Sequence, residues 1–242
     1  MRDPDTDSRA DTGPSDDTPG DCPRPDGRLL RGEATRERVL DAAERLFSAE
    51  GVDAVSIRQI AAAAGVTLGV VGFHGGSKTE LIRTVLSRRV EALNIARRDR
   101  LARVMAGPAP KLDDLVEAYI LPYLEYASHD DPQWGAYARL IARIVADDRW
   151  YKNVGELYDP MAREYLDAMQ QVCPEADRDA LVTALTLTVA SMLSLVASRA
   201  RIAGLTGHAG GNAMDHRDTL VSFCVNGMTA IASRKGGPQD GP

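Results

Sequence analysis

The sequence predicts an all-α protein. After residue 30, apolar side chains recur at the spacing of one helix face, as in Val39, Ala43 and Phe47. The segments Ser56–Gln59 and Ser77–Glu80 have the form of capping boxes, in which a Ser side chain and the Gln or Glu three residues later satisfy each other's backbone donors. No segment of alternating polarity predicts a β-strand.

Two tails, residues 1–30 and 236–242, are predicted to be disordered. Residues 1–30 are acidic and rich in Asp, Pro, Gly, Ser and Thr, with too few apolar side chains to offset the entropy lost on ordering. They also lack the apolar run of a signal peptide. The cysteines Cys22, Cys173 and Cys224 show no paired spacing, which indicates a reducing, cytoplasmic setting and neither a disulfide framework nor a zinc site.

Residues 31–86 are predicted to form a domain with a helix-turn-helix. The first helix is expected to begin at Thr35 and to end at Gly51, a natural C-cap. Gly65 ends the second helix, and Thr67 is the predicted N-cap of a third helix of about two turns. A helix before this short pair and a long helix after it complete the arrangement of a helix-turn-helix domain.

Residues 87–235 are predicted to form a second helical domain. Its run 180–197 is uncharged and just long enough to span a bilayer. Its Ser and Thr hydroxyls and the lack of a second such run favour a helix buried at an interface, so no membrane partner is expected. The helices of this domain are expected at 112–127 with a kink at Pro122, from Pro132, and at about 154–173, 177–203 and 215–233.

Charge is distributed unevenly along the chain. The net charge is -6, yet residues 28–105 carry fourteen Lys or Arg against nine Asp or Glu. A basic head within an acidic protein is typical of a nucleic-acid-binding domain, while the overall acidity argues against indiscriminate binding to polyanions.

The segment TRERVLDAAERLFSAEGVDAVSIRQIAAAAGVTLGVVGFHGGSKTELIRTVL, residues 35–86, resembles the N-terminal DNA-binding domain of the TetR family of bacterial transcriptional repressors. Its third helix, within VTLGVVGFHGGSK, is most similar to a subgroup typified by a fatty-acid-responsive regulator. The chain past residue 110 is only loosely similar to that subgroup. The resemblance rests on the spacing of Thr35-Arg36, Ala42-Ala43, Leu46-Phe47, Gly51, Ser56, Ile60-Ala61, Ala64-Gly65-Val66, His74 and Ser77-Lys78.

The resemblance implies that the third helix lies in the major groove of DNA. Residues 66–75 contain no Arg, Lys, Asn or Gln, the types that make bidentate contacts with bases. We therefore expect few direct contacts with base edges, so much of the specificity should come from DNA shape and from the positions of the phosphates. Lys78, in the first turn of the fourth helix, is predicted to contact phosphate. The predicted DNA-binding residues are Thr35, Arg36, Ser56, Arg58, Thr67, Leu68, Val70, Phe73, His74 and Lys78.

Two glycines depart from the family pattern, which usually has an aromatic residue at the position of Gly75 and Asn or Tyr at that of Gly72. Glycine weakens a helix interior by up to about 1 kcal/mol relative to Ala. We therefore expect a frayed recognition helix and loose docking between the third and fourth helices. On this interpretation, Gly75→Phe tightens DNA binding.

The resemblance also implies that the last two helices pair with a twofold mate in a homodimer and that a hydrophobic small molecule binds among the middle helices. Aromatic and Met side chains at helical spacing can line such a cavity or form an ordinary core. Arg139 and Arg143 either bind a carboxylate or acyl-thioester head group or are solvated or paired with Asp. The predicted ligand-binding residues are Tyr119, Tyr123, Trp134, Tyr137, Ile141, Tyr158, Met161 and Tyr165.

The predicted function is a homodimeric repressor that binds a palindromic operator in double-stranded DNA and is released by a hydrophobic effector, acyl or otherwise lipid-like. The alternative is a ligand- or partner-binding helical protein with a weakened DNA-binding head. The chain has no GxSxG elbow, phosphate-binding loop, HExxH motif or Cys/His cluster. An enzyme is therefore not expected, and neither is a cofactor or a metal.

Overall fold

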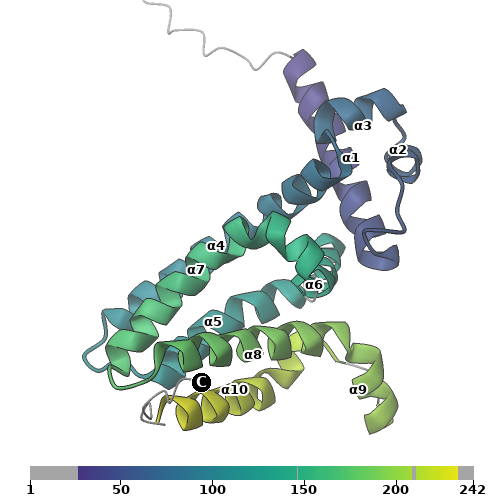
Figure 1. Cartoon of the computed structure of the whole chain (residues 1–242). Coiled ribbons are helices and arrows are strands. Elements are labelled where there is room, and N and C mark those ends of the chain that lie inside the picture. Colours follow the sequence, from purple (N-terminus) through teal and green to yellow (C-terminus); the bar gives the residue numbers. More distant parts are fainter. Residues whose placement is uncertain (1–26, 146, 209–210, 234–242) are drawn as a thin grey trace, which may run out of the picture.

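A computed structural model describes residues 27–145, 147–208 and 211–233 (Figure 1). These ranges are helical with no β-strand, which confirms the all-α prediction. The helices are α1 (Gly27–Glu50), α2 (Ile57–Ala64), α3 (Leu68–Gly75), α4 (Lys78–Met105), α5 (Leu112–Ala127), α6 (Pro132–Val145), α7 (Asp148–Val172), α8 (Arg178–Ala197), α9 (Arg199–Thr206), the 3-10 helix η1 (Ala213–His216) and α10 (Arg217–Ala232).

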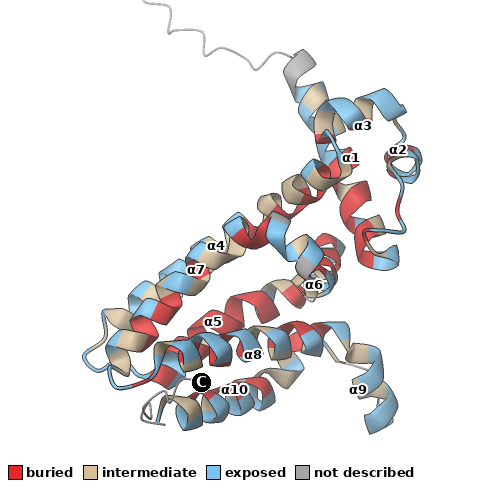
Figure 2. Ribbon diagram, in the orientation of Figure 1, coloured by how far each residue is buried: buried red, intermediate tan, exposed pale blue. Residues whose placement is uncertain are grey.

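The helices form a head and a body (Figure 1). The head consists of α1, α2, α3 and the start of α4, and α4 continues from it into the body, where it packs on α5 and α7. The pair α8 and α10 lies at the end of the molecule away from the head, and α9 projects from the body without a single buried residue. Because α1 also packs on α6, head and body share one apolar core (Figure 2).

Four predicted helix ends of the head are confirmed, those at Gly51, Ser56, Gly65 and Ser77. Gly51 and Gly65 have φ values of 90° and 65°, in the left-handed region that glycine adopts without strain. In the box that opens α2, the Ser56 amide donates to Gln59 Oε1 over 2.8 Å, and Ser56 Oγ accepts from the Gln59 amide. Ser77 and Glu80 make the same reciprocal bonds at the start of α4. Because its carboxylate accepts the Ser77 amide, the pKa of Glu80 is lowered.

The first helix begins earlier than the sequence predicted. It starts at Gly27, so Thr35 lies inside the helix, where its hydroxyl donates to the carbonyl of Arg31. The prediction of a start at Thr35 was therefore wrong, and residues 27–30 belong to the helix, not to the tail. Good helix formers precede Thr35, and the lone Gly32 costs only about 1 kcal/mol. The rest of the predicted tails, 1–26 and 236–242, lies outside the described residues.

Three helix ends in the body also differ from prediction. The helix expected from about residue 154 begins at Asp148, where the Asp147 side chain accepts a bond from the Arg149 amide. The expected helix 177–203 is broken at Ser198 into α8 and α9, and that expected at 215–233 begins with η1. Side-chain caps at Asp147 and Asn212 mark two of these ends, and such local bonds leave little trace in apolar periodicity.

A buried ion cluster joins head and body. The carboxylate of Glu44 on α1 is fully buried and lies 2.8 Å from Arg88 Nη2 and 3.4 Å from Arg89 Nη2 on α4. The Arg89 guanidinium also lies over the ring of Trp134 on α6, 4.9 Å from its centroid. Burial outweighs the two cations and raises the pKa of Glu44. The cluster thus connects α1, α4 and α6 through charged side chains that are largely buried.

Candidate nucleic-acid interface and ligand-binding core

The helix-turn-helix is formed by α2 and α3, between which the chain bends by 104°. Helix α3 buries Val71 and Gly75 and exposes Leu68, Gly69, Gly72 and Phe73, which share the opposite face. The side chain of Phe73 is 85% exposed. Of the other predicted contacts on α3, Val70 and His74 are half-buried at the edges of this face. The exposed face of α3 therefore combines small residues with one large aromatic ring.

Gly75 is a packing position, contrary to the expectation that it loosens the contact between α3 and α4. A Cβ built on Gly75 would lie 2.7 Å from Cδ1 of Leu81 on α4, and Leu81 is fully buried. Leu81 thus occupies the space that the aromatic side chain was expected to fill. A side chain at Gly75 requires Leu81 to move, so the effect of Gly75→Phe on DNA binding stays a prediction.

Polar side chains surround the exposed face of α3. Thr67 stands at its N-cap, but its hydroxyl makes no capping hydrogen bond. Lys78 Nζ donates to the carbonyl of Asp53 over 3.3 Å, which places its charge beside the loop that leads into α2. Arg58 is exposed in the first turn of α2, just after Ser56. These groups thus stand at or next to the starts of α2, α3 and α4.

Thr35 and Arg36 do not open a helix, so they offer no helix N-terminus to phosphate. Arg36 is exposed on α1 and lies 3.5 Å from the carboxylate of Glu37. Because α1 packs on α3, both residues still belong to the head. Their contact with DNA stays a prediction.

The eight predicted ligand-binding residues lie on α5, α6 and α7 and belong to the shared core. All except the half-buried Tyr158 are buried. Tyr119 and Tyr165 meet edge to face with ring centroids 4.9 Å apart, and Trp134 contacts Tyr137 in the same manner at 5.9 Å. The structure thus places them in one core, while their contact with a ligand stays a prediction.

Three phenols of this cluster, those of Tyr123, Tyr137 and Tyr158, are hydrogen-bonded. Tyr123 donates to the carbonyl of Ala138 over 2.9 Å, and the hydroxyls of Tyr137 and Tyr158 lie 3.0 Å apart. Burial raises the pKa of Tyr137 to about 12 and also raises the pKa values of Tyr123 and Tyr158. These hydroxyls can therefore donate hydrogen bonds but cannot supply negative charge near neutral pH.

The two arginines considered for a ligand head group have structural partners. Arg139 Nε donates to the hydroxyl of Ser48 over 3.2 Å, and Arg143 Nη2 donates to the carbonyl of Ala49. Both contacts tie α6 to the end of α1. Sequence reasoning missed a different arginine, Arg97, which is buried in the body. The sequence feature that could have identified Arg97 is its position four residues after Leu93, on the apolar stripe of α4.

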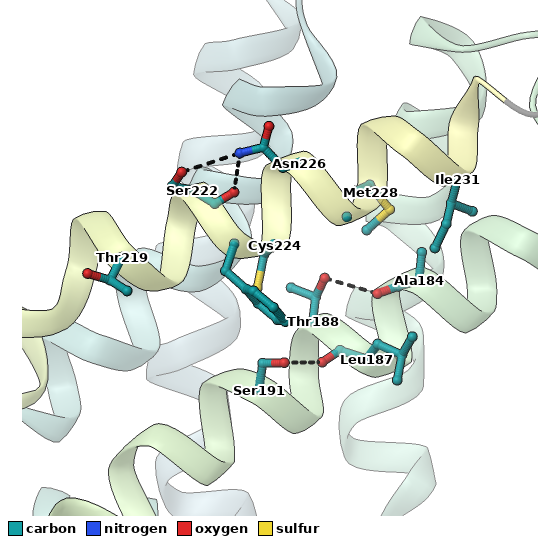
Figure 3. Close-up of a pocket in the computed structure, with 12 residues that line it drawn as sticks. Ala184, Leu187, Thr188, Ser191, Thr219, Ser222, Cys224, Asn226, Met228 and Ile231 are labelled. Atoms are coloured by element: carbon teal, nitrogen blue, oxygen red, sulfur yellow. Dashed lines mark hydrogen bonds between the residues drawn. The ribbon is translucent and has the colours of Figure 1, made fainter. Parts of the chain in front are cut away.

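Helices α8 and α10 border a cleft that carries both apolar and hydroxyl side chains (Figure 3). This cleft of about 850 Å³ lies between the two helices, lined by residues such as Thr188, Ser191 and Met228. Leu187 on α8 and Phe223 on α10 are 57% and 68% exposed. Helix α8 is long and apolar enough to cross a membrane, with 39% of its most apolar window buried. Its inner side packs on α6, α7 and α10, so the outer side alone lacks a cover within the described chain.

Both parts of the chain match known families. Residues 39–85 match the family of bacterial regulatory proteins named tetR, and residues 117–227 match the tetracyclin repressor-like C-terminal domain. The chain belongs to the TetR family. The head thus contains the match to bacterial regulatory proteins, and TetR-family regulators are generally not enzymes.

Two curated TetR-family relatives match a limited part of the chain. The regulator SrpR of Pseudomonas putida is 43% identical over 63 residues, which are 26% of this chain and 30% of SrpR. The regulator TtgR, also of Pseudomonas putida, is 37% identical over 71 residues, which are 29% of this chain and 31% of TtgR. Either match spans less than a third of the relative's length.

Solved structures share the fold over most of the chain. FadR from Bacillus subtilis in complex with stearoyl-CoA has a TM-score of 0.60 at 11% identity, covering 79% of this chain and 98% of FadR. NalD, the secondary repressor of the MexAB-OprM efflux pump in Pseudomonas aeruginosa, has a TM-score of 0.55 at 21% identity, covering 81% of this chain and 97% of NalD. At these identities, the likeness concerns the fold.

Proposed function

We propose that this TetR-family protein is a repressor that binds a palindromic operator as a homodimer. The exposed face of α3 is the observation that carries the proposal. Gly69 and Gly72 leave the backbone open there, so α3 can approach the floor of a major groove about 12 Å wide. The ring of Phe73 is available for thymine methyl groups, and Leu68 and Val70 extend the apolar contact.

Phosphate contacts position the head on the duplex. Lys78 and Arg58 supply positive charge, and the hydroxyls of Thr67 and Ser56 lie at helix starts whose backbone dipoles attract phosphate. Such contacts carry no sequence information. Direct readout therefore rests on few side chains, and DNA shape contributes the remainder.

A second copy covers the outer face of α8 and α10 in this proposal. The exposed Leu187 and Phe223 on adjacent helices supply the apolar surface that a twofold four-helix contact buries. The twofold axis of this contact also relates the α3 helix of one protomer to that of its partner. Half-sites one helical turn, about 34 Å, apart would receive them.

A hydrophobic effector releases the repressor from DNA by favouring a body conformation that no longer suits both half-sites. The support is the aromatic cluster of α5, α6 and α7, together with the shared fold of FadR, whose structure holds stearoyl-CoA. The same likeness supports an acyl or lipid-like effector and the fatty-acid-responsive subgroup. The proposed protein acts in the cytoplasm, where the DNA is.

Nuclease protection across the DNA upstream of its own gene, over a range of salt concentrations, tests the proposal. We expect one protected inverted repeat, whose protection weakens as salt rises. Phe73→Ala should weaken that protection, whereas Leu205→Ala, which truncates a similarly exposed apolar side chain on α9, should not. Equal loss in both variants would remove the assigned role of the α3 face.

The runner-up is a ligand-binding protein whose head no longer reads DNA. The observation in its favour is Gly72, which lowers helix propensity in the middle of α3. Absence of any sequence-selective protection at low salt, with ligand binding intact, would favour this alternative.

A further inference from the structure

Arg97 is a buried cation at the centre of the body. It lies on α4 and is only 4% exposed. Its Nε donates to the carbonyl of Tyr119 over 3.1 Å, and its Nη2 lies 3.9 Å from the sulfur of Met192 on α8. The guanidinium also lies over the Tyr119 ring, 3.9 Å from the centroid. A carbonyl, a thioether and a ring face surround this charge, and all three are neutral.

The charge of Arg97 is not balanced within the described part of the chain. Neighbouring arginines on α4 have carboxylate partners: Arg98 Nη2 lies 2.9 Å from Glu164, and Arg100 pairs with Glu125. No ion pair is formed by Arg97 among the residues that the structure describes. The Tyr165 phenol donates its hydrogen to the backbone carbonyl of Arg97, and burial raises its pKa, so it supplies no negative charge to the guanidinium.

An unbalanced buried charge is costly for folding. Removing a cation from water without a paired anion costs several kcal/mol, so proteins rarely keep such a group for stability alone. Replacing Arg97 by an apolar side chain of similar volume would remove that cost. The presence of Arg97 on the apolar stripe of α4 therefore needs a reason beyond packing.

We propose that Arg97 binds the carboxylate of a monoanionic, amphipathic effector. This inference rests on the proposed function, because it names the chemical class of the molecule that acts on the regulator. A guanidinium binds a carboxylate through two parallel hydrogen bonds, which are roughly twice as strong as neutral ones. The sulfur of Met192 is the weakest of the present partners, and the flexible Met side chain can move aside for the anion.

The surroundings select for one negative charge on an apolar body. Arg97 is one guanidinium, so a dianion or a polyphosphate would bring charge that nothing here balances. The edge-to-face rings of Tyr119 and Tyr165 lie beside the guanidinium and offer apolar surface. Pro122 lies on the same helix as Tyr119 and has no N–H. The carbonyl of Ala118, next to Tyr119, therefore has no helical hydrogen-bond donor four residues later.

The test compares acids with alcohols of the same carbon skeleton. Wild-type protein is titrated calorimetrically with decanoate and decanol, hexadecanoate and hexadecanol, and phenylacetate and phenethyl alcohol, and Tm is measured with each. At least one acid should bind more tightly than its alcohol. Arg97→Met should remove that preference, a loss of roughly 10- to 100-fold for charge-assisted hydrogen bonds. The matched control Arg98→Gln removes a charge next to Arg97 and should keep the preference.

A second readout separates ligand binding from a structural role. If Arg97 is kept for a ligand at a cost in stability, Arg97→Met should raise the Tm of the ligand-free protein by several degrees. A lowered Tm would overturn the proposal, as would the absence of any acid preference in the wild type. These measurements need no DNA, so a failure of the repressor proposal would appear separately, as missing operator protection.

Discussion

Among single residues, Phe73 has the most exposed large apolar side chain of the described chain. Its ring contacts the edge of His74 at 5.0 Å between centroids, and it leaves most of its surface in water. A single exposed apolar side chain is ordinary on a protein surface, so the role proposed for Phe73 rests on its place beside the open Gly69 and Gly72 on α3. In the proposed function, these three residues let α3 approach DNA closely and replace polar contacts with bases.

The contribution of Lys78 to DNA binding should be electrostatic. Lys78→Ala is expected to lower affinity for the operator and for unrelated DNA about equally and to reduce the slope of log affinity against log salt by about one. Fluorescence anisotropy at several salt concentrations measures both. Lys111→Ala, which removes an exposed cation at the start of α5, serves as the control. A loss confined to the operator would contradict a phosphate role for Lys78.

Gly72 should weaken the helix while it permits close approach. A Cβ at this position meets nothing within 4 Å, so Gly72→Ala should raise the free energy of unfolding by roughly 0.5–1 kcal/mol. The same methyl group would enter the space between α3 and DNA and lower operator affinity. Gly204→Ala on α9, equally open, should gain stability without changing DNA binding. Tighter operator binding by Gly72→Ala would instead mean that helix fraying limits affinity.

The predictability of individual residues depended on sequence separation. Ser56 with Gln59 and Ser77 with Glu80 were predictable because both partners of each capping box lie three residues apart. Gly75 was misread because its partner Leu81 meets it only through the packing of two helices. Arg97 was missed because its neighbours come from three other helices.

At the scale of helices, the docking of α3 on α4 depends on the absence of a side chain at Gly75. Gly75→Ala should lower the free energy of unfolding by roughly 1–3 kcal/mol, because its Cβ would overlap the buried Leu81. Chemical denaturation measures the change. The double variant with Leu81→Val should lose less than the sum of the single variants, since Val lacks the overlapping methyl group. Strict additivity would show that Leu81 is not the cause.

The packing of α1 on α4 should make the free energy of unfolding depend on pH through the buried carboxyl of Glu44. Burial raises the pKa of this carboxyl above its ordinary value of 4.5 in the folded protein. The bound proton therefore contributes its whole stabilisation at pH values below 4.5. That contribution is lost as the pH rises through the folded-state pKa. The difference in unfolding free energy between wild type and Glu44→Gln should therefore fall with rising pH above 4.5. Denaturant titrations across that range measure it. A difference that rises with pH would mean that Arg88 and Arg89 outweigh burial.

Helix existence was more predictable than helix length. Apolar periodicity reports a buried face, so it located each helix of the body except the separate α9, which has no buried residue. The same signal says little about where the chain leaves a helix. The extension of α1 before Thr35 and the break at Ser198 both lie outside the apolar stripe, and no side-chain capping bond marks the break.

For the whole molecule, the uncovered face of α8 and α10 should determine the oligomeric state. Leu187→Glu places a charge in the proposed contact, so we expect a monomer that has lost most of its operator affinity. Sedimentation equilibrium distinguishes the states. Leu205→Glu on α9, at a position 78% exposed, should remain dimeric. A dimer of unchanged strength in the Leu187 variant would place the interface elsewhere.

The continuity of α4 has a mechanical consequence. One helix, Lys78–Met105, carries Lys78 at its first turn and Arg97 in the body, and the 19 residue steps from Lys78 to Arg97 correspond to about 28 Å at 1.5 Å per residue. With Arg97 as the pivot, a tilt of about 5° would displace the first turn by about 2.5 Å, nearly the length of a hydrogen bond. Helix α4 can therefore act as a lever, and an angular change too small to disturb packing in the body would break the phosphate register of the head.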